Sequence, residues 1–142
     1  MSDRITPRNP SRDRLPPLAR ESMTDAQRAA ADELIAGPRK AVKGPFIPLL
    51  RSPELMARVQ KVGEYLRFGS ALSPRISEFA TLCVAREWRQ QFEWFVHVPL
   101  ALKAGTSSET IAALREGRRP EAMSDDEALV HDFCIELQRT HG

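Results

Sequence analysis

Glu93 and His97 are the two residues of this sequence best placed for acid–base chemistry. They stand four positions apart in an apolar segment, and a helix puts residues with that spacing on one face. A nearby carboxylate favours the protonated form of an imidazole, whereas burial disfavours it. An imidazole under both influences can exchange protons near neutral pH, as a general acid or base must. Ordinary helix-stabilising ion pairs have the same spacing, so the spacing leaves both interpretations open.

Glu78 is a second carboxylate that could join this pair. It lies about 140° around its helix from Cys83, and it therefore avoids the apolar stripe that contains Ile76, Phe79 and Cys83. It faces either solvent or a neighbouring helix, and in the second case it could reach His97.

The other residue types that often do chemistry give weaker signals. Zinc sites usually need three or four ligands, and neither HExxH nor the paired ExxH of di-iron bundles occurs, so we expect no metal and no cofactor. His131 and His141 are isolated and are expected at the surface or at helix ends. The two cysteines, Cys83 and Cys134, are expected to be buried in the core. The two tryptophans, Trp88 and Trp94, are expected mainly in the core, and the alternative is that they wall a pocket.

The elements that must position these residues all have helical periodicity, and the fold class expected is all-α. The predicted helices cover residues 24–36, 52–68, 73–88, 90–104, 106–115 and 124–137. Capping boxes are predicted at Thr24 with Gln27, at Thr106 with Glu109 and at Ser124 with Glu127. Residues 38–51 are predicted to form a packed, irregular connection, Pro99 to kink its helix, and Gly105 to take a left-handed conformation just past it.

The length of 142 residues fits one domain. Residues 1–22, rich in proline and arginine, are expected to form an extended lead-in, and residues 23–142 a single helical domain. The rest of the chain is close to neutral, which gives no footprint for nucleic acid, and no run approaches the roughly 18 apolar residues of a membrane span. We expect a cytoplasmic protein that binds neither nucleic acid nor membrane.

The last apolar stripe, which ends at Leu137, has little chain after it to cover it. Partner subunits or a further segment would have to do so. We therefore expect a homo-oligomer, or a helical domain that is incomplete at its C-terminus.

Three runs of sequence resemble the carboxymuconolactone decarboxylase family, which also contains the alkylhydroperoxidase D redox proteins. These runs are residues 77–86 (SEFATLCVAR), 92–97 (FEWFVH) and 100–105 (LALKAG), and GPF at 44–46 with RSPEL at 51–55 is similar to the lead-in of many members. The resemblance covers about residues 24–140. It implies an alkylhydroperoxidase D-like helical bundle assembled as a trimer or hexamer.

The resemblance also implies roles for individual residues. The motif of the redox branch consists of a glutamate, a CxxC pair and a histidine. The glutamate matches Glu78 and the histidine matches His97, but the two cysteine positions hold Gln90 and Glu93. Peroxide reduction needs the sulfur itself. The chain therefore looks more like the decarboxylase branch, whose members act on a lactone carboxylic acid without a cofactor.

We therefore hypothesise a cofactor-free carboxy-lyase or proton-transfer enzyme acting on a cyclic carboxylic acid or lactone. Glu78, Glu93 and His97 would be catalytic. His97 would supply or relay the proton, Glu93 would be its ion-pair partner, and Glu78 would contact His97 without reaching the substrate. Arg86 and Trp94 would bind the substrate, since an acid needs a cation and an aromatic ring can wall a pocket. The alternatives are a peroxiredoxin-type antioxidant activity of the same fold and a non-catalytic helical oligomer.

Overall fold

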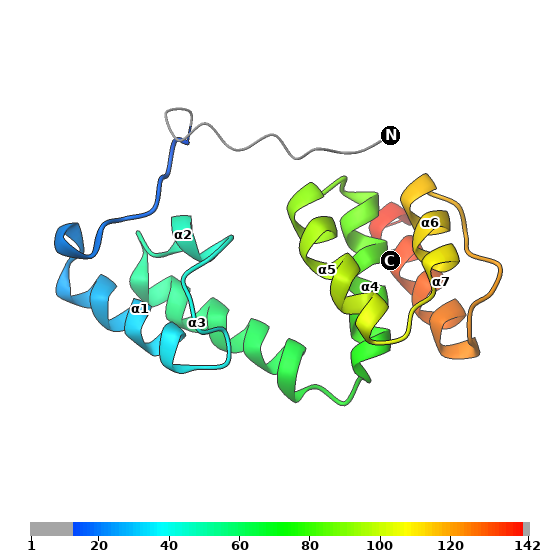
Figure 1. Ribbon diagram of the computed structural model, residues 1–142, viewed down its shortest axis with the longest axis horizontal. Coiled ribbons are helices and arrows are strands. Elements are labelled where there is room, and N and C mark those ends of the chain that lie inside the picture. The colour runs from blue at the N-terminus through cyan, green and yellow to red at the C-terminus, as the bar shows by residue number, and fades with distance from the viewer. Residues whose placement is uncertain (1–12, 141–142) are drawn as a thin grey trace. The chain divides into compact units, whose positions relative to one another are not determined.

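The computed structural model describes residues 13–140, and every regular element in this part of the chain is helical (Figure 1). The all-α fold class predicted from the sequence is confirmed. The chain divides into two compact units, Met1–Phe68 and Gly69–Gly142. The single domain predicted over residues 23–142 stays a prediction. None of the described helices is long and apolar enough to cross a membrane.

The first unit is built on three helices, α1 (Asp25–Ala36), α2 (Phe46–Leu49) and α3 (Pro53–Glu64). α3 packs against α1 and α2, and the core residues are Ala30, Ala31, Leu34, Phe46, Leu50 and Met56. The connection over residues 38–51 was predicted to be irregular. It contains the single helical turn α2, because Phe46 and Leu50 are buried on the same side of it.

The two ends of this unit depart from regular α-helix. The predicted lead-in falls partly on residues 1–12, which lie outside the described residues. Its described part includes a short 3₁₀ turn, η2 (Arg20–Ser22), and Arg20 is bound to Asp32 of α1 through two hydrogen bonds of 2.7 and 2.8 Å. The second predicted helix was expected to run on to Gly69, but α3 ends at Glu64 and a π-helical turn, η3 (Tyr65–Gly69), follows it.

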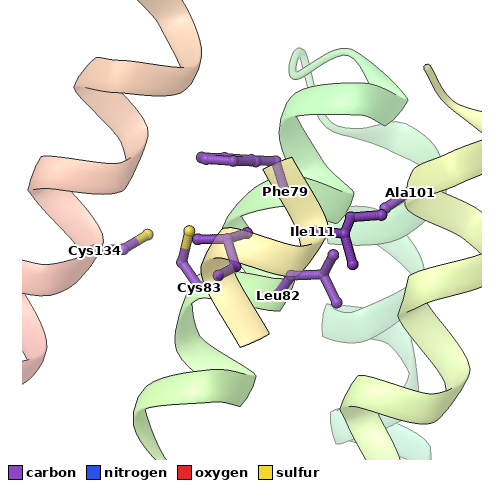
Figure 2. Packing of buried hydrophobic residues seen from close by; sticks show 7 residues of the cluster. Phe79, Leu82, Cys83, Ala101, Ile111 and Cys134 are labelled. Carbon is purple, nitrogen blue, oxygen red and sulfur yellow. The ribbon is translucent and has the colours of Figure 1, made fainter. Parts of the chain in front are cut away.

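The second unit holds the candidate catalytic residues. It consists of α4 (Pro74–Glu87), α5 (Gln91–Lys103), α6 (Ser108–Glu116) and α7 (Asp125–Thr140), and α4 packs against each of the other three. Seven residues form its buried core: Phe79, Leu82, Cys83, Ala101, Ile111, Leu114 and Cys134. Figure 2 shows Cys134 extending from α7 toward Cys83 on α4. Both thiols are buried, as predicted.

Local sequence fixes where these helices begin and end. Ser73 caps α4 and is followed by Pro74 in its first turn, and the predicted capping box of Ser124 and Glu127 is present at α7. Gly105 has a φ of 97°, the left-handed conformation predicted just past α5. The capping box predicted at Thr106 is wrong, because the side chain of Ser107 accepts the hydrogen bond from the Thr110 N–H.

α7 is held by an ion pair that the apolar pattern does not show. Glu127 is fully buried and accepts hydrogen bonds of 2.9 and 3.0 Å from Arg75 on α4. Burial works to raise the pKa of Glu127, but Arg75 and the Ser124 N–H outweigh it, so the pKa lies below its ordinary value.

His131, predicted at the surface or at a helix end, is instead buried in the middle of α7 beside Asp132. It lies on the same face of α7 as Glu127 and Cys134, the face that packs against the rest of the unit. Arg119 binds both oxygens of Asp132 at 3.0 and 2.9 Å. Arg119, together with His131, holds the pKa of Asp132 well below its ordinary range. His131 is therefore part of an ionic contact between α7 and the loop before it.

Candidate functional site

α4 and α5 bring the three candidate catalytic residues together. The turn at residues 88–90 folds α5 back against α4, and Gln90 caps α5 by accepting a hydrogen bond from the Phe92 N–H. Glu78 lies in the first half of α4, whereas Glu93 and His97 lie one turn apart on α5. Because the two helices run in opposite directions, the beginning of α4 lies beside the later turns of α5. The sequence left open whether Glu78 faces solvent, and it faces α5.

His97 is held between the two carboxylates. Its Nδ1 lies 2.6 Å from Oε2 of Glu78, and its Nε2 lies 3.3 Å from Oε2 of Glu93. The side chains of His97 and Glu78 are 13% and 12% exposed, whereas that of Glu93 is 37% exposed. We call these three residues the Glu–His–Glu cluster. Its three members form a line from the interior, at Glu78, to the surface, at Glu93.

The hydrogen bonding of the cluster gives the two imidazole nitrogens different tasks. An ionised carboxylate can only accept hydrogen bonds, so with Glu78 ionised it is Nδ1 that donates in this contact. This contact fixes the ring orientation and leaves Nε2 as the nitrogen that can give or take a proton on the side of Glu93. A carboxylate, an imidazole and a second carboxylate that lie within reach of one another form an arrangement suited to proton transfer.

An open hollow lies next to the cluster. Its volume is about 630 Å³, and it is lined by Ala80, Thr81, Val84, Ala85 and Trp88 from α4 and its end, and by Gln90 and Glu93 from the beginning of α5. Glu93 belongs to both the hollow and the cluster. A molecule bound in the hollow would therefore meet Glu93 directly, and His97 through it.

Neither of the two predicted substrate-binding residues, Arg86 and Trp94, lines this hollow. The Nε of Arg86 donates a 2.8 Å hydrogen bond to the carbonyl oxygen of Arg115 in α6. Trp94 packs against the buried core, and the guanidinium of Arg115 lies 5.9 Å from the centre of its ring. Binding of substrate by Arg86 and Trp94 stays a prediction, and none of these contacts supports it.

Trp88 lines the hollow, which is the alternative that the sequence interpretation left open beside a place in the core. It was expected mainly in the core, but it is 66% exposed and lines the hollow. Its Nε1 donates a 2.5 Å hydrogen bond to Oε1 of Gln138 on α7, which fixes the direction of the indole ring. The signal in the sequence was its position at the end of the third predicted helix, directly before the turn, where a large side chain is less easily covered.

The two cysteines lie in the core and not at the hollow. Burial, together with the neighbouring Cys134, raises the pKa of the Cys83 thiol to about 12, and burial also raises the pKa of Cys134. The thiolate is the reactive form of cysteine. These two thiols are therefore poor nucleophiles near neutral pH. No group of three or more histidine, cysteine, aspartate or glutamate side chains in residues 13–140 is arranged to hold a metal ion.

Comparison with known proteins gave one match. The model of the carboxymuconolactone decarboxylase family matches residues 53–128, a segment that contains α4, α5 and α6 and all three members of the Glu–His–Glu cluster. The searches of curated proteins and of solved structures gave no match.

Proposed function

Since the chain belongs to the carboxymuconolactone decarboxylase family, we propose that it is a cofactor-free enzyme that transfers a proton on a cyclic lactone or its carboxylic acid. Glu78, Glu93 and His97 are its catalytic machinery. The observation that carries the proposal is the position of His97 between two carboxylates, one of which lines the hollow.

The proton follows the line of the cluster. Glu93 gives a proton to a carbon atom of the substrate or takes one from it, and Nε2 of His97 restores the protonation state of Glu93. Glu78 does not reach the substrate in this scheme. It is a positioning residue, because it holds Nδ1 of His97 and stabilises the positive charge that appears when the imidazole is protonated.

Decarboxylation and simple proton transfer share this step. In a decarboxylation, the bond between the ring carbon and the carboxylate breaks, CO₂ leaves, and the electron pair moves into the conjugated carbonyl group. The same carbon then accepts a proton from Glu93. In an isomerisation, Glu93 removes a proton from one carbon and returns it to another through the same enolate.

Charge in the hollow favours the uncharged lactone over the acid. The carboxylate of Glu93 forms part of the wall, and when ionised it repels a substrate carboxylate at short range. The guanidinium of Arg86, which could have offset this repulsion, is directed to α6. We therefore place proton transfer on a lactone ahead of decarboxylation.

The thiol-dependent alternative has no support from the site. The buried thiols of Cys83 and Cys134 have raised pKa values, and neither lines the hollow. The resemblance described above extends to the alkylhydroperoxidase D redox proteins. Peroxide reduction requires an accessible thiolate, however, and the hollow offers none.

The test is exchange of substrate hydrogen for deuterium. Unsaturated lactones, each with and without a carboxylate substituent, are incubated with the protein in D₂O and followed by NMR. We expect exchange at the carbon next to the carbonyl, and we expect Glu93→Gln and His97→Ala each to reduce its rate by roughly 10²- to 10⁴-fold.

Glu109→Gln is the matched control, because Glu109 is an exposed glutamate of α6 outside the site. It should exchange hydrogen at the rate of the unmodified protein. Full activity in both Glu93→Gln and His97→Ala would overturn the proposal.

A further inference from the structure

Gln90 brings a hydrogen-bond donor to the hollow. Its side-chain oxygen accepts a 3.3 Å hydrogen bond from the Phe92 N–H. The NH₂ group of the same amide, which can only donate, makes no hydrogen bond to any described residue. Gln90 is exposed and lines the hollow. Its NH₂ group can therefore donate to a molecule bound there.

The other side-chain donors around the hollow are already engaged. The hydroxyl of Thr81 donates a 2.9 Å hydrogen bond to a carbonyl oxygen of its own helix, α4, and Nε1 of Trp88 donates to Gln138. The remaining lining residues are Glu93, which only accepts when it is ionised, and apolar side chains. Gln90 is therefore the donor that a bound molecule meets without breaking a contact within the described chain.

Gln90 and Glu93 lie next to each other at the beginning of α5. Gln90 is the N-cap and Glu93 is the third residue of the helix, and side chains at these two positions are neighbours at the start of a helix. Both line the hollow. A donor and a carboxylate placed in this way can contact adjacent parts of one small ring, such as a carbonyl oxygen and the carbon next to the carbonyl.

We propose that the NH₂ group of Gln90 binds the carbonyl oxygen of the substrate, which makes Gln90 a catalytic residue beside Glu93. This role rests on the proposed function, and it identifies the substrate as an uncharged lactone with a flat, unsaturated ring. The carbonyl oxygen lies at Gln90, the carbon next to the carbonyl lies at Glu93, and the ring lies against Trp88.

The hydrogen bond from Gln90 strengthens as the proton is transferred. When Glu93 takes the proton, the C–H bond next to the carbonyl breaks, an O–H bond forms on Glu93, and the electron pair moves into the carbonyl group. The negative charge that leaves Glu93 appears on the carbonyl oxygen, which becomes that of an enolate. A donor beside this oxygen gains most once the oxygen is charged. Gln90 keeps its own hydrogens throughout, and the proton returns from Glu93 to carbon.

Trp88 supplies a wall whose direction is fixed. Its Nε1 is bound to Gln138 of α7, and the neighbouring Glu87 accepts hydrogen bonds of 2.9 and 3.0 Å from Arg139 of α7. These contacts tie the end of α4 to α7. An aromatic ring held in one direction favours a flat ligand, which can stack on it, over a puckered one. An unsaturated lactone has such a ring.

The rate of hydrogen exchange in D₂O tests the role of Gln90. Serine also caps helices, so Gln90→Ser keeps an acceptor for the Phe92 N–H but is too short to replace the amide in the hollow. We expect kcat to fall roughly 10- to 100-fold with little change in KM, because the lost hydrogen bond matters most in the transition state. Circular dichroism verifies that the variant keeps its helices.

Gln91→Ser is the matched control for this experiment. Gln91 is an exposed glutamine of α5 that does not line the hollow, so Gln91→Ser should exchange hydrogen at the rate of the unmodified chain.

Nuclear magnetic resonance tests the same contact without turnover. In the ¹⁵N-labelled chain, the side-chain NH₂ signals of Gln90 are identified by their loss in Gln90→Ser, and the indole N–H signal of Trp88 by its loss in Trp88→Phe. An uncharged five-membered unsaturated lactone (a butenolide) should shift both sets of signals and leave the NH₂ signals of Gln91 in place. Tetrahydrofuran, a ring of the same size without a carbonyl group, should leave the Gln90 signals unchanged.

The two measurements separate the role of Gln90 from the proposed function. If Gln90→Ser exchanges the lactone hydrogen at the full rate, or if saturating lactone leaves the Gln90 signals unchanged, the role is wrong even where Glu93→Gln abolishes exchange. If the lactone shifts the Gln90 signals but the unmodified chain exchanges no hydrogen, the binding contact is confirmed, whereas proton transfer and the catalytic role of Gln90 are both refuted.

Discussion

Two ionic clusters in the second unit differ in how their charges balance. Glu127 is one buried acid, and Arg75 and the Ser124 N–H together supply three hydrogen bonds to it. His97 is one imidazole between two acids, Glu78 and Glu93. In the first cluster one cation balances one acid. In the second cluster, two ionised carboxylates carry one more negative charge than a single protonated imidazole can balance.

The difference shows that burial of a charge does not by itself identify a reactive group. A buried carboxylate with a full set of donors is held in its ionised state and has no reason to change it. A carboxylate that contacts an imidazole and also lines an open hollow is placed to pass a proton between that imidazole and a bound molecule. We therefore expect substitutions in the two clusters to have separable effects, on stability in the first and on activity in the second.

The largest effect on stability is expected from Glu127→Ala. This change leaves Arg75 without its partner and removes the capping box of α7, and we expect it to lower the free energy of unfolding by about 3 kcal/mol. Urea unfolding followed by circular dichroism measures the loss. Glu127→Gln, which keeps an acceptor for the Ser124 N–H, should lose less. If Glu127→Ala is as stable as the unmodified chain, the ion pair of Glu127 with Arg75 does not stabilise the packing of α7 on α4.

The opposite pattern is expected for Glu78→Gln. The amide oxygen can still accept the hydrogen bond from Nδ1 of His97, but the negative charge is gone, so kcat should fall roughly 10- to 100-fold with KM unchanged. The free energy of unfolding should change by less than about 1 kcal/mol. Exchange of lactone hydrogen measures the first quantity and urea unfolding the second. A raised KM with normal kcat would mean that Glu78 contacts the substrate.

Acid should weaken the first cluster in a predictable direction. The pKa of Glu127 lies below its ordinary value of 4.5 in the folded chain, so its contribution to stability is complete above that value. The contribution is lost as the pH falls through the lower pKa of the folded state. The stability difference between the unmodified chain and Glu127→Gln should therefore shrink below about pH 4. A constant difference down to the lowest pH would contradict the assigned pKa direction.

The sequence predicted the helices and part of the site because these depend on local spacing. The i,i+4 spacing of Glu93 and His97 puts them on one face of any helix, and Ser73-Pro74 marks the start of α4 wherever it packs. Glu78 was different. Its position outside the apolar stripe allowed both solvent and a neighbouring helix, and only the packing of α5 on α4 decides between them.

What the sequence could not predict depends on which side of a helix finds a partner. The spacing of five apolar residues predicts the helix of α3, but one of the five is buried and four are 41–61% exposed: Met56 is the buried one, and the exposed ones are Leu55, Val59, Val62 and Leu66. The polar Gln60 is buried in their place. On α7, likewise, Glu127 and His131 face the interior and Phe133 faces outward. An ion pair such as that of Glu127 with Arg75 joins residues far apart in sequence, so no periodicity reveals it.

The smallest expected effect concerns a polar group that has no partner, which extends the comparison to a third case. The Oγ1 of Thr106 is buried and makes no hydrogen bond to the described part of the chain, whereas the nearby Thr110 is equally buried and its Oγ1 accepts one from Ser107. Removing a buried hydroxyl without a partner recovers its desolvation cost, so Thr106→Val should raise the free energy of unfolding by up to about 1 kcal/mol. Thr110→Val is the matched control and should lower it, because Ser107 then loses its acceptor. Urea midpoints at equal slope measure both changes. If Thr106→Val destabilises the chain as much as Thr110→Val does, the Thr106 hydroxyl has a hydrogen-bond partner, as the carboxylate of Glu127 does.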